Sequence, residues 1–451
     1  MKKTLHFWML LVMALSIVSC NEDNDNSIPA ADVPLNETLA ANKLFSDIEE
    51  NPDVLTMKKK SDGKLDYKSQ YSMCFRQAVN HDQPDGETFQ QRVCILFRGY
   101  DRPTILVTEG YLWGGFGDIE YLGINLNANM VHVEHRNFGN SFNQDKGQRK
   151  YQTCAQASAD LHAVYQALKP IFKGKWMSAG TSKNGMTSMY YAYYYPNDMD
   201  LAAAFCSPFM LTLGDKNFGE YLLNEVGNEE LRDLMKKSIR RAFENGEQGI
   251  YKNVCELAKN KDKQVPTFTE YVFNTFDTYF NILQYTRPNN HKARMETITL
   301  TNDNFAEAIF TTVLDNRDPD IYTYFVDCAK GMGFPDPGYG YFADLLEGTS
   351  FKAENVLPTE LKEEDRFVVN QYNGSHTLDM TNHFFMNSTI PLLFYYSHDD
   401  PWSGGQPKKL GANAKKVINP IGIHSPKIND PDYCPAEVKK EVMDFVSNYI
   451  Y

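Results

Sequence analysis

The stretch WMSAGTSKNGMTS (176–188) places one serine, Ser182, where an apolar run ends and a helical segment begins. The apolar run is typical of a buried strand, and the segment after it is rich in Met and Tyr. A serine nucleophile held on such a sharp turn needs small residues on either side. Gly180 meets this need, but Asn184 takes the place of the second glycine in G-x-S-x-G, and Gly185 follows one residue later. The motif alone leaves two interpretations open, a strained nucleophile and an ordinary loop serine.

Short apolar runs on both sides of this motif indicate a parallel sheet. They cover 104–111, 130–136, 176–180 and 201–208, and segments of crossover length separate them. Nearly continuous apolar runs are what a sheet buried on both faces requires. Between the second and third runs, apolar residues recur at helical spacing, at Leu161, Val164, Leu168 and Ile171. The sequence therefore predicts a strand, a helix and a second strand leading into the serine motif.

The segment 211–375 has a different pattern, in which helices alternate with loops. One helical stripe ends at Gly246 and contains Leu231, Leu234, Met235, Ile239, Ala242 and Phe243. A second helix is expected to begin at Thr267, because Thr267 and Glu270 have the spacing of a capping box. We therefore predict a helical cap over 211–375.

Strand character returns after this segment. The runs 390–397 and 415–422 suit strands, and 435–450 suits a final amphipathic helix. The simplest architecture is an α/β-hydrolase core with a mainly parallel sheet, divided into the halves 45–210 and 376–451 by the inserted cap.

The acid and the histidine of a catalytic triad follow these last two strands. Asp399 and Asp400 come directly after 390–397, and His424 comes directly after the next run. Both positions lie at strand C-terminal ends, the edge where parallel sheets gather their sites. Serine, acid and histidine in this order favour Ser182 as a nucleophile over a loop serine. In that arrangement His424 takes the serine proton and the carboxylate orients the imidazole.

Five segments carry a family resemblance: VTEGY (107–111), LNANMVHVEHRNFGNS (126–141), GKWMSAGTSKNG (174–185), HDDPW (398–402) and GIHSPKI (422–428). Together they resemble the secreted bacterial prolyl tripeptidyl aminopeptidases. These are serine peptidases, more distantly similar to the lysosomal Pro-Xaa carboxypeptidases and dipeptidyl peptidase II. The resemblance covers nearly all of 45–451. It implies a capped α/β-hydrolase that removes short peptides from free N-termini, often after proline.

Matched to the family motifs, the catalytic residues are Ser182 as nucleophile, Asp400 as acid in preference to Asp399, and His424 as base. Two positions depart from the family pattern, Asn137 where an aromatic residue is usual and Asn184 where a glycine is usual. These departures concern the shape of the S1 pocket and the geometry of the elbow, rather than the class of reaction.

An acyl transfer site also needs donors for the developing oxyanion. The backbone N–H of Lys183 is expected to be one donor, and the second is expected near Gly110 and Tyr111 or at Phe138. No cofactor and no metal are expected, because no close His, Cys and carboxylate cluster has ligand spacing.

An exopeptidase must also hold the positive amino terminus of its substrate, for which a carboxylate is the natural partner. Glu109 and Glu134 are candidates, because both are expected at strand ends on the active-site edge. The alternative for Glu134 is a structural role, in which it pairs with Arg136 or holds a neighbouring loop.

The first residues indicate export. Lys2 and Lys3 precede an apolar run too short to span a bilayer, and small residues lead to Cys20. We expect 1–19 to be a lipoprotein signal peptide, Cys20 to carry the lipid, and 20–44 to be an acidic tether. The protein would then be anchored in the outer membrane of the cell envelope, facing either the periplasm or the exterior. The alternative is an ordinary signal peptide with an incidental cysteine.

Two of the eight cysteines lie in a predicted hairpin. The arms are 71–79 and 87–100, and a turn centred on Gln83 and Pro84 would place Cys74 opposite Cys94. Because cross-strand neighbours can be close enough to bond, the sequence suggests a disulfide between them.

The formal net charge of −13 argues against nucleic acid as a partner, and the expected partner is an oligopeptide substrate. Two alternatives to an aminopeptidase stay open. One is an esterase or lipase with the same triad, since a fold does not determine its substrate. The other is a lipid-anchored peptide-binding protein with an idle triad, which Asn184 favours and the intact order of serine, acid and histidine disfavours.

Overall fold

The computed structural model describes residues 43–44, 46–60, 67, 69–113, 117–141, 146–313, 319–357 and 369–451. The predicted signal peptide, the predicted lipidation site Cys20 and all but the last residues of the predicted tether lie outside these ranges. Within them, no helix combines the length and apolar character needed to cross a bilayer.

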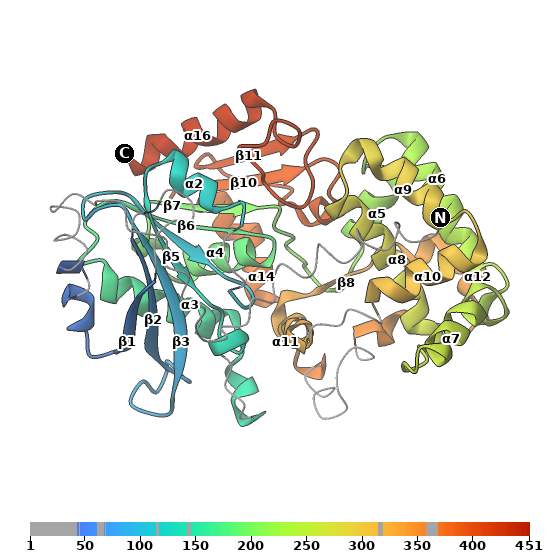
Figure 1. Cartoon of the computed structure of the whole chain (residues 1–451), viewed down its shortest axis with the longest axis horizontal. Coiled ribbons are helices and arrows are strands. Elements are labelled where there is room, and N and C mark those ends of the chain that lie inside the picture. Colours follow the sequence, from blue (N-terminus) through green and yellow to red (C-terminus); the bar gives the residue numbers. More distant parts are fainter. Residues whose placement is uncertain are drawn as a thin grey trace, which may run out of the picture.

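The centre of the molecule is one nine-stranded sheet (Figure 1). Its strands lie in the order β1 (Val54–Lys60), β2 (Ser69–Ala78), β3 (Thr88–Phe97), β5 (Asn129–Val133), β4 (Thr104–Thr108), β6 (Trp176–Thr181), β7 (Leu201–Phe205), β10 (Leu392–Ser397) and β11 (Ala414–Asn419). All neighbours from β5 to β11 are parallel, whereas β1, β2, β3 and β5 pair antiparallel. The predicted mainly parallel sheet is confirmed, and the fold is that of an α/β-hydrolase.

Both faces of the parallel part are buried, as its apolar runs require. Along β7, Ala202 and Ala204 belong to one apolar core, and Ala203 and Phe205 belong to the other. The first core includes residues of α3 (Cys154–Leu168) and α4 (Lys183–Tyr194), and the second includes residues of α2 (Glu120–Asn125) and α16 (Ala436–Ile450). The crossover helix predicted before the serine motif is α3.

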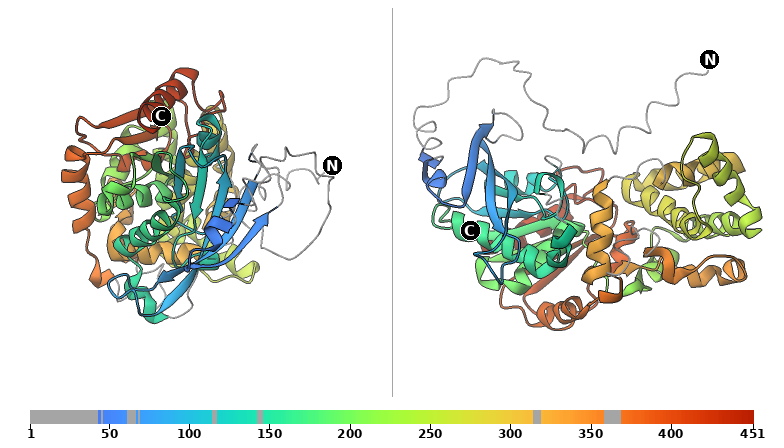
Figure 2. Two further views of the ribbon diagram at one scale, coloured as in Figure 1. Left: turned by 90° about the vertical axis from the view of Figure 1, so that its left-hand side faces the viewer. Right: turned by 90° about the horizontal axis from the view of Figure 1, so that it is seen from below.

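Helices occupy most of the chain between β7 and β10, and they gather to one side of the sheet (Figure 2). They are α5 (Asn217–Asn224), α6 (Glu229–Phe243), α7 (Ile250–Asn260), α8 (Phe268–Tyr285), α9 (His291–Ile298), α10 (Asn302–Val313), α11 (Pro319–Asp327) and α12 (Ala343–Leu346). A short parallel pair, β8 (Leu213–Asp215) and β9 (Phe334–Pro335), accompanies them. The capping box predicted for α8 is confirmed between Thr267 and Glu270. The division of the chain into units at 210 and 375 stays a prediction.

The chain then returns to the core through α14 (Ser375–Asp379) and α15 (Phe385–Asn387). The Tyr190 hydroxyl of α4 hydrogen-bonds to Thr377, and the Tyr193 hydroxyl donates to Asp379 at 2.7 Å. These contacts attach the segment before β10 to the helix that follows the serine.

The predicted hairpin forms, but its register is two residues away from the expected one. Cys74 pairs with Arg92, and Cys94 pairs with Ser72, because the turn is centred on Gln83 alone. Both cysteines are free thiols. The predicted disulfide is therefore wrong, since a shift of two residues keeps both side chains on one face but separates them along the strands.

Candidate active site

Ser182 lies on a strained turn between β6 and α4. Its φ of 60° and ψ of −129° place a residue with a side chain in the left-handed half of the backbone map. The surrounding backbone holds it there, because its N–H donates to Phe205 at 2.8 Å and its carbonyl accepts from Gly185 at 3.0 Å and Met186 at 3.1 Å. Strain of this kind persists only where the structure over-determines it, and it exposes the side chain at the edge of the sheet.

The small residues of the elbow are Gly180 and Gly185. A Cβ on Gly180 would collide with the backbone of Asn184, and a Cβ on Gly185 would collide with the Ser207 hydroxyl. Asn184 itself lies in the first turn of α4, where its side chain donates to Glu109 Oε2 at 2.6 Å and accepts from Gly110 N at 2.8 Å. The departure from G-x-S-x-G therefore leaves the elbow intact and fastens it to the end of β4.

The structure brings together the three residues that the chain order singled out. His424 Nε2 lies 2.8 Å from Ser182 Oγ, and His424 Nδ1 lies 2.8 Å from Asp400 Oδ2. Asp400 is fully buried, and its other oxygen accepts from the backbone of Trp402 at 3.0 Å. With Nδ1–H donating to the carboxylate, Nε2 is left to accept the serine proton. Asp399 instead lies 2.9 Å from the ring of His398.

Helix α8 covers this triad. The His424 N–H donates to the Gln284 carbonyl at 3.3 Å, and the Gln284 side chain accepts from the Trp402 indole at 2.6 Å. The Trp402 ring lies 5.9 Å from the imidazole of His424 and 5.2 Å from the ring of Phe280. The capping box at Thr267 predicted α8, but no sequence pattern indicated this contact, because the C-terminal turn of α8 meets residues more than a hundred positions away.

The predicted oxyanion donors differ in whether their backbone N–H groups already have an acceptor. Lys183 N follows the nucleophile, and a Cβ on Gly110 would lie 2.8 Å from the Lys183 carbonyl carbon. In the part of the chain that the structure describes, the backbone N–H groups of Lys183 and Tyr111 have no acceptor. The Phe138 N–H already donates to His135 at 3.2 Å. Of the two candidates for the second donor, Tyr111 has the available hydrogen.

The Lys183 side chain is buried, which no sequence pattern indicated. Its ammonium group forms an ion pair with Asp327 at 2.9 Å and donates to the Gly110 carbonyl. It also lies 5.0 Å from the Tyr111 ring and 4.7 Å from the Phe138 ring. One lysine thus connects the elbow, the loop after β4 and the end of α11.

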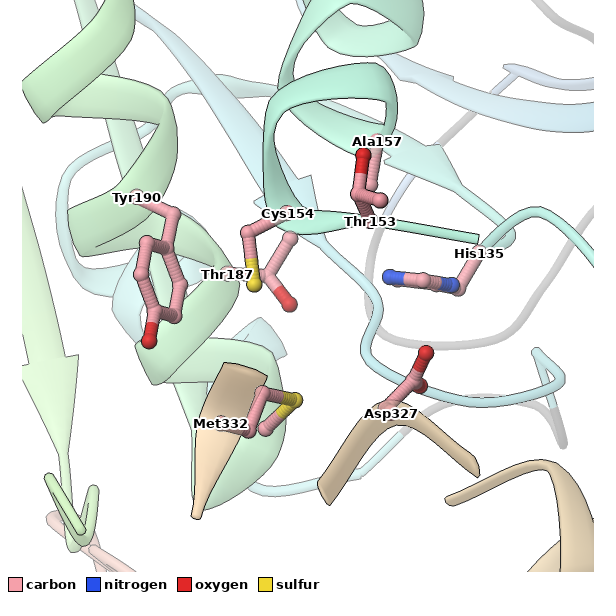
Figure 3. Close-up of a pocket in the computed structure, with 8 residues that line it drawn as sticks. All are labelled: His135, Thr153, Cys154, Ala157, Thr187, Tyr190, Asp327 and Met332. Atoms are coloured by element: carbon pink, nitrogen blue, oxygen red, sulfur yellow. The ribbon is translucent and has the colours of Figure 1, made fainter. Parts of the chain in front are cut away.

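A pocket lies next to Asp327, the ion-pair partner of this lysine (Figure 3). Its lining residues are His135, Thr153, Cys154, Ala157, Thr187, Tyr190, Asp327 and Met332. Burial, followed by the charge of Lys183, lowers the pKa of His135 to about 4. The imidazole is therefore neutral at neutral pH, and no residue of the triad lines this pocket.

The two predicted amine-binding carboxylates have protein partners on both oxygens. Glu109 contacts His132 Nδ1 at 3.1 Å, and its other oxygen accepts from Asn184. Glu134 accepts from the Trp113 backbone at 3.1 Å and from both the N–H and the hydroxyl of Ser141 at 2.8 Å. Their role toward a substrate amine stays a prediction, whereas their role in bracing two loops is visible.

Glu134 was also expected to pair with Arg136 or to hold a neighbouring loop. The structure shows the loop contact. Arg136 forms its ion pair elsewhere, with Asp160 at 2.6 Å. Among the residues described, no group of three or more His, Cys, Asp or Glu side chains is placed to hold a metal ion.

Comparison with known proteins places the chain in a family. The model of the family described as PS-10 peptidase S37 matches residues 55–294. The prolyl tri/tetrapeptidyl aminopeptidase of Streptomyces mobaraensis is 27% identical over 362 residues, 76% of this chain and 71% of that protein.

Among solved structures, the proline iminopeptidase of Mycobacterium smegmatis has 15% identity and a TM-score of 0.39, covering 83% of this chain and 98% of its own. The homoserine O-acetyltransferase of Staphylococcus aureus has 11% identity and a TM-score of 0.41, covering 86% and 95%. The family match spans more than half of the chain and contains the nucleophile elbow. The chain belongs to the PS-10 peptidase S37 family and is a serine peptidase.

Proposed function

We propose that this serine peptidase is an aminopeptidase that releases tripeptides, with cleavage after proline, from the free N-termini of oligopeptides. The observation that carries the proposal is the position of His424, with one ring nitrogen on Ser182 Oγ and the other on Asp400. The name of the Streptomyces mobaraensis relative, a prolyl tri/tetrapeptidyl aminopeptidase, supports the specificity.

The geometry supports a two-step acyl transfer. Ser182 Oγ attacks the carbonyl carbon of the scissile bond while His424 Nε2 accepts its proton, and Asp400 stabilises the imidazolium. His424 then gives this proton to the leaving amine, which departs and leaves an ester on Ser182. A water molecule, deprotonated by His424, hydrolyses the ester and restores the serine. The N–H groups of Lys183 and Tyr111 are the proposed donors to the oxyanion in both steps.

The test compares Ala-Ala-Pro p-nitroanilide with a free and with an acetylated amino terminus. The proposal predicts release of nitroaniline from the free form only, and a loss of about 10⁴-fold or more in kcat for Ser182→Ala. Ser447→Ala, on α16 and away from the triad, is the matched control and should retain full activity. Cleavage of simple esters without cleavage of either anilide would favour an esterase. No turnover of any substrate, with peptide binding retained, would favour a binding protein with an idle triad.

We also propose that the mature chain begins at a lipidated Cys20 and is held in the outer membrane. The support is the sequence alone, an apolar run ending in small residues before a cysteine and a polar, acidic segment after it. Expression of the full chain in a Gram-negative host, with Cys20→Ser beside it, tests this. The proposal predicts that radiolabelled palmitate enters the parent protein and not the variant. Equal labelling of both, or of neither, would contradict it.

A further inference from the structure

A row of polar side chains follows one face of α8 away from the triad. The Trp402 indole donates to Gln284 at 2.6 Å, Gln284 donates to Asn281 at 2.6 Å, and Asn281 donates to Asp277 Oδ2 at 3.2 Å. Residues three and four apart share a helix face, so these side chains point the same way. The row therefore leads from the loop of the catalytic acid to a carboxylate in the cap.

The Asp277 carboxylate accepts a hydrogen bond from an amide side chain. In the described part of the chain, Asn281 is its hydrogen-bond partner, and no basic side chain contributes to its pKa. Burial raises the pKa of Asp277 to about 7, although the side chain is only half-buried. A positive group brought next to this carboxylate would restore the ionised form, which burial alone disfavours. Glu109 and Glu134, by contrast, have protein partners on both carboxylate oxygens.

Tyr285, the last residue of α8, lies between Asp277 and the catalytic acid in its electrostatic contacts. Its side chain is 53% exposed, yet the surrounding protein raises its pKa to about 12, and the charges of Asp277 and Asp400 add to the increase. Tyr285 and Asp277 are eight residues apart in α8 and share a helix face, and neither side chain is fully buried.

The distance along α8 suits a tripeptide. Asp277 lies seven residues before Gln284, whose carbonyl receives the His424 N–H, and seven residues of α-helix extend over about 10 Å. An extended peptide advances about 3.3 Å per residue, so three residues span about the same 10 Å.

From these contacts we infer that Asp277 binds the α-ammonium group of the substrate and thereby sets the released peptide at three residues. The inference rests on the proposed aminopeptidase function and names the group that makes it an exopeptidase. It assigns the amine to a cap helix, whereas the sequence pointed to strand ends of the core.

Binding without turnover tests the inference separately from catalysis. In a Ser182→Ala background, calorimetry compares Ala-Ala-Pro amide with its N-acetylated form. We expect the free amine to bind about 10- to 100-fold more tightly, as for a charge-assisted hydrogen bond. Adding Asp277→Asn should remove this preference without weakening binding of the acetylated form. Adding Asp233→Asn, an exposed carboxylate of α6 in the same cap, should leave it unchanged.

A second variant keeps the inference testable if Asp277→Asn does not fold. Asp277→Glu retains the charge on a longer stem, so it should retain the preference for a free amine. In the active enzyme, kcat/KM for Ala-Pro, Ala-Ala-Pro and Ala-Ala-Ala-Pro anilides should peak at the tripeptide, and Asp277→Asn should flatten this series. Equal binding of free and acetylated peptide, or a preference that survives Asp277→Asn, would overturn the inference.

A separate measurement distinguishes a failure of the proposed function from a failure of the Asp277 inference. A burst of p-nitrophenolate from p-nitrophenyl acetate with the parent enzyme reports the triad alone. If the burst is absent while the Asp277-dependent preference for the free amine persists, the acyl-enzyme mechanism is contradicted and the amine site is upheld. If the burst is present and the preference is absent, Asp277 is excluded and the triad is upheld.

Discussion

At the scale of single residues, Asn184 explains how the elbow tolerates a departure from its usual pattern. The two positions where a Cβ cannot fit are Gly180 and Gly185, so residue 184 is free to carry a side chain. That side chain satisfies both the Gly110 N–H and a carboxylate oxygen of Glu109. Because the loop at 110 supplies the proposed second oxyanion donor, the asparagine holds that loop against the nucleophile.

Replacing Asn184 by the more usual glycine should therefore lower both the activity and the stability of the enzyme. We expect Asn184→Gly to lower kcat at least tenfold with little change in KM, because the loop after β4 loses its attachment to the elbow. It should also lower the free energy of unfolding by about 1–3 kcal/mol, the cost of leaving buried polar groups unpaired. Steady-state kinetics and urea unfolding measure both effects. Asn253→Gly on α7 is the control for stability alone, and higher activity in Asn184→Gly would contradict the account.

A second residue-scale prediction concerns Glu120, in the first turn of α2. Burial raises its pKa from 4.5 to about 7, while the charge of His132 opposes the increase. The folded state therefore holds a proton that the unfolded state releases, and stability falls as pH rises from about 4.5 to 7. Below about pH 4.5 the raised pKa of Glu120 contributes its full stabilisation of the folded state, and above about pH 7 this stabilisation is lost.

Glu120→Gln removes this dependence. Between pH 4.5 and 7 the parent should lose about 3 kcal/mol of unfolding free energy relative to the variant. Urea unfolding across this range measures the difference, with the exposed Glu256→Gln as control. A parent that gains stability relative to Glu120→Gln as pH rises would refute the prediction.

At the scale of elements, the buried pair of Lys183 and Asp327 joins α4 to α11. The exposed fractions of the two side chains are 2% and 7%, so each charge depends on the other. Asp327 Oδ1 also accepts from Gln152 at 2.7 Å, which ties the same point to the segment before α3. The helix that begins at the nucleophile is thereby connected directly to the helical region that covers it.

Replacing one residue of this ion pair should lower the free energy of unfolding more than replacing both residues. Asp327→Leu leaves an unpaired buried ammonium and should lower the free energy of unfolding by about 3–5 kcal/mol. The double variant Lys183→Met with Asp327→Leu should recover most of that stability, because neither charge remains. A double-mutant cycle by urea unfolding gives the coupling. Additive losses from the two sites would show that the pair has no energetic role.

At the scale of the whole molecule, the fold is stabilised without disulfides in the described residues. The cysteines from Cys74 to Cys434 are all free, and most are buried small residues within the two apolar cores or beside them. We therefore expect reducing agent to leave the Tm unchanged. Under denaturing, non-reducing conditions, a thiol-alkylating reagent should modify every one of these cysteines, as read by mass spectrometry. An unmodified pair that reacts only after reduction would contradict this.

Much of the architecture could be predicted because it depends on local patterns. The apolar runs at 104–111 and 201–208 became β4 and β7, and the Thr267 capping box began α8. Hairpin register could not be predicted with the same accuracy. The observed pairs lie two residues from the expected ones, and no local pattern around Gln83 and Pro84 distinguishes the two registers.

The class of fold and the order of serine, acid and histidine could be predicted from local patterns, because strands buried on both faces and a strained elbow require particular residues locally. The tertiary structure was needed to show that β5 lies between β3 and β4, that Gln284 meets His424, and that hydrogen bonds lead from Trp402 along α8 to Asp277. The physical reason is that these relations join residues far apart in the chain. Polar residues on a helix face have the same local pattern whether they border solvent or a catalytic cleft.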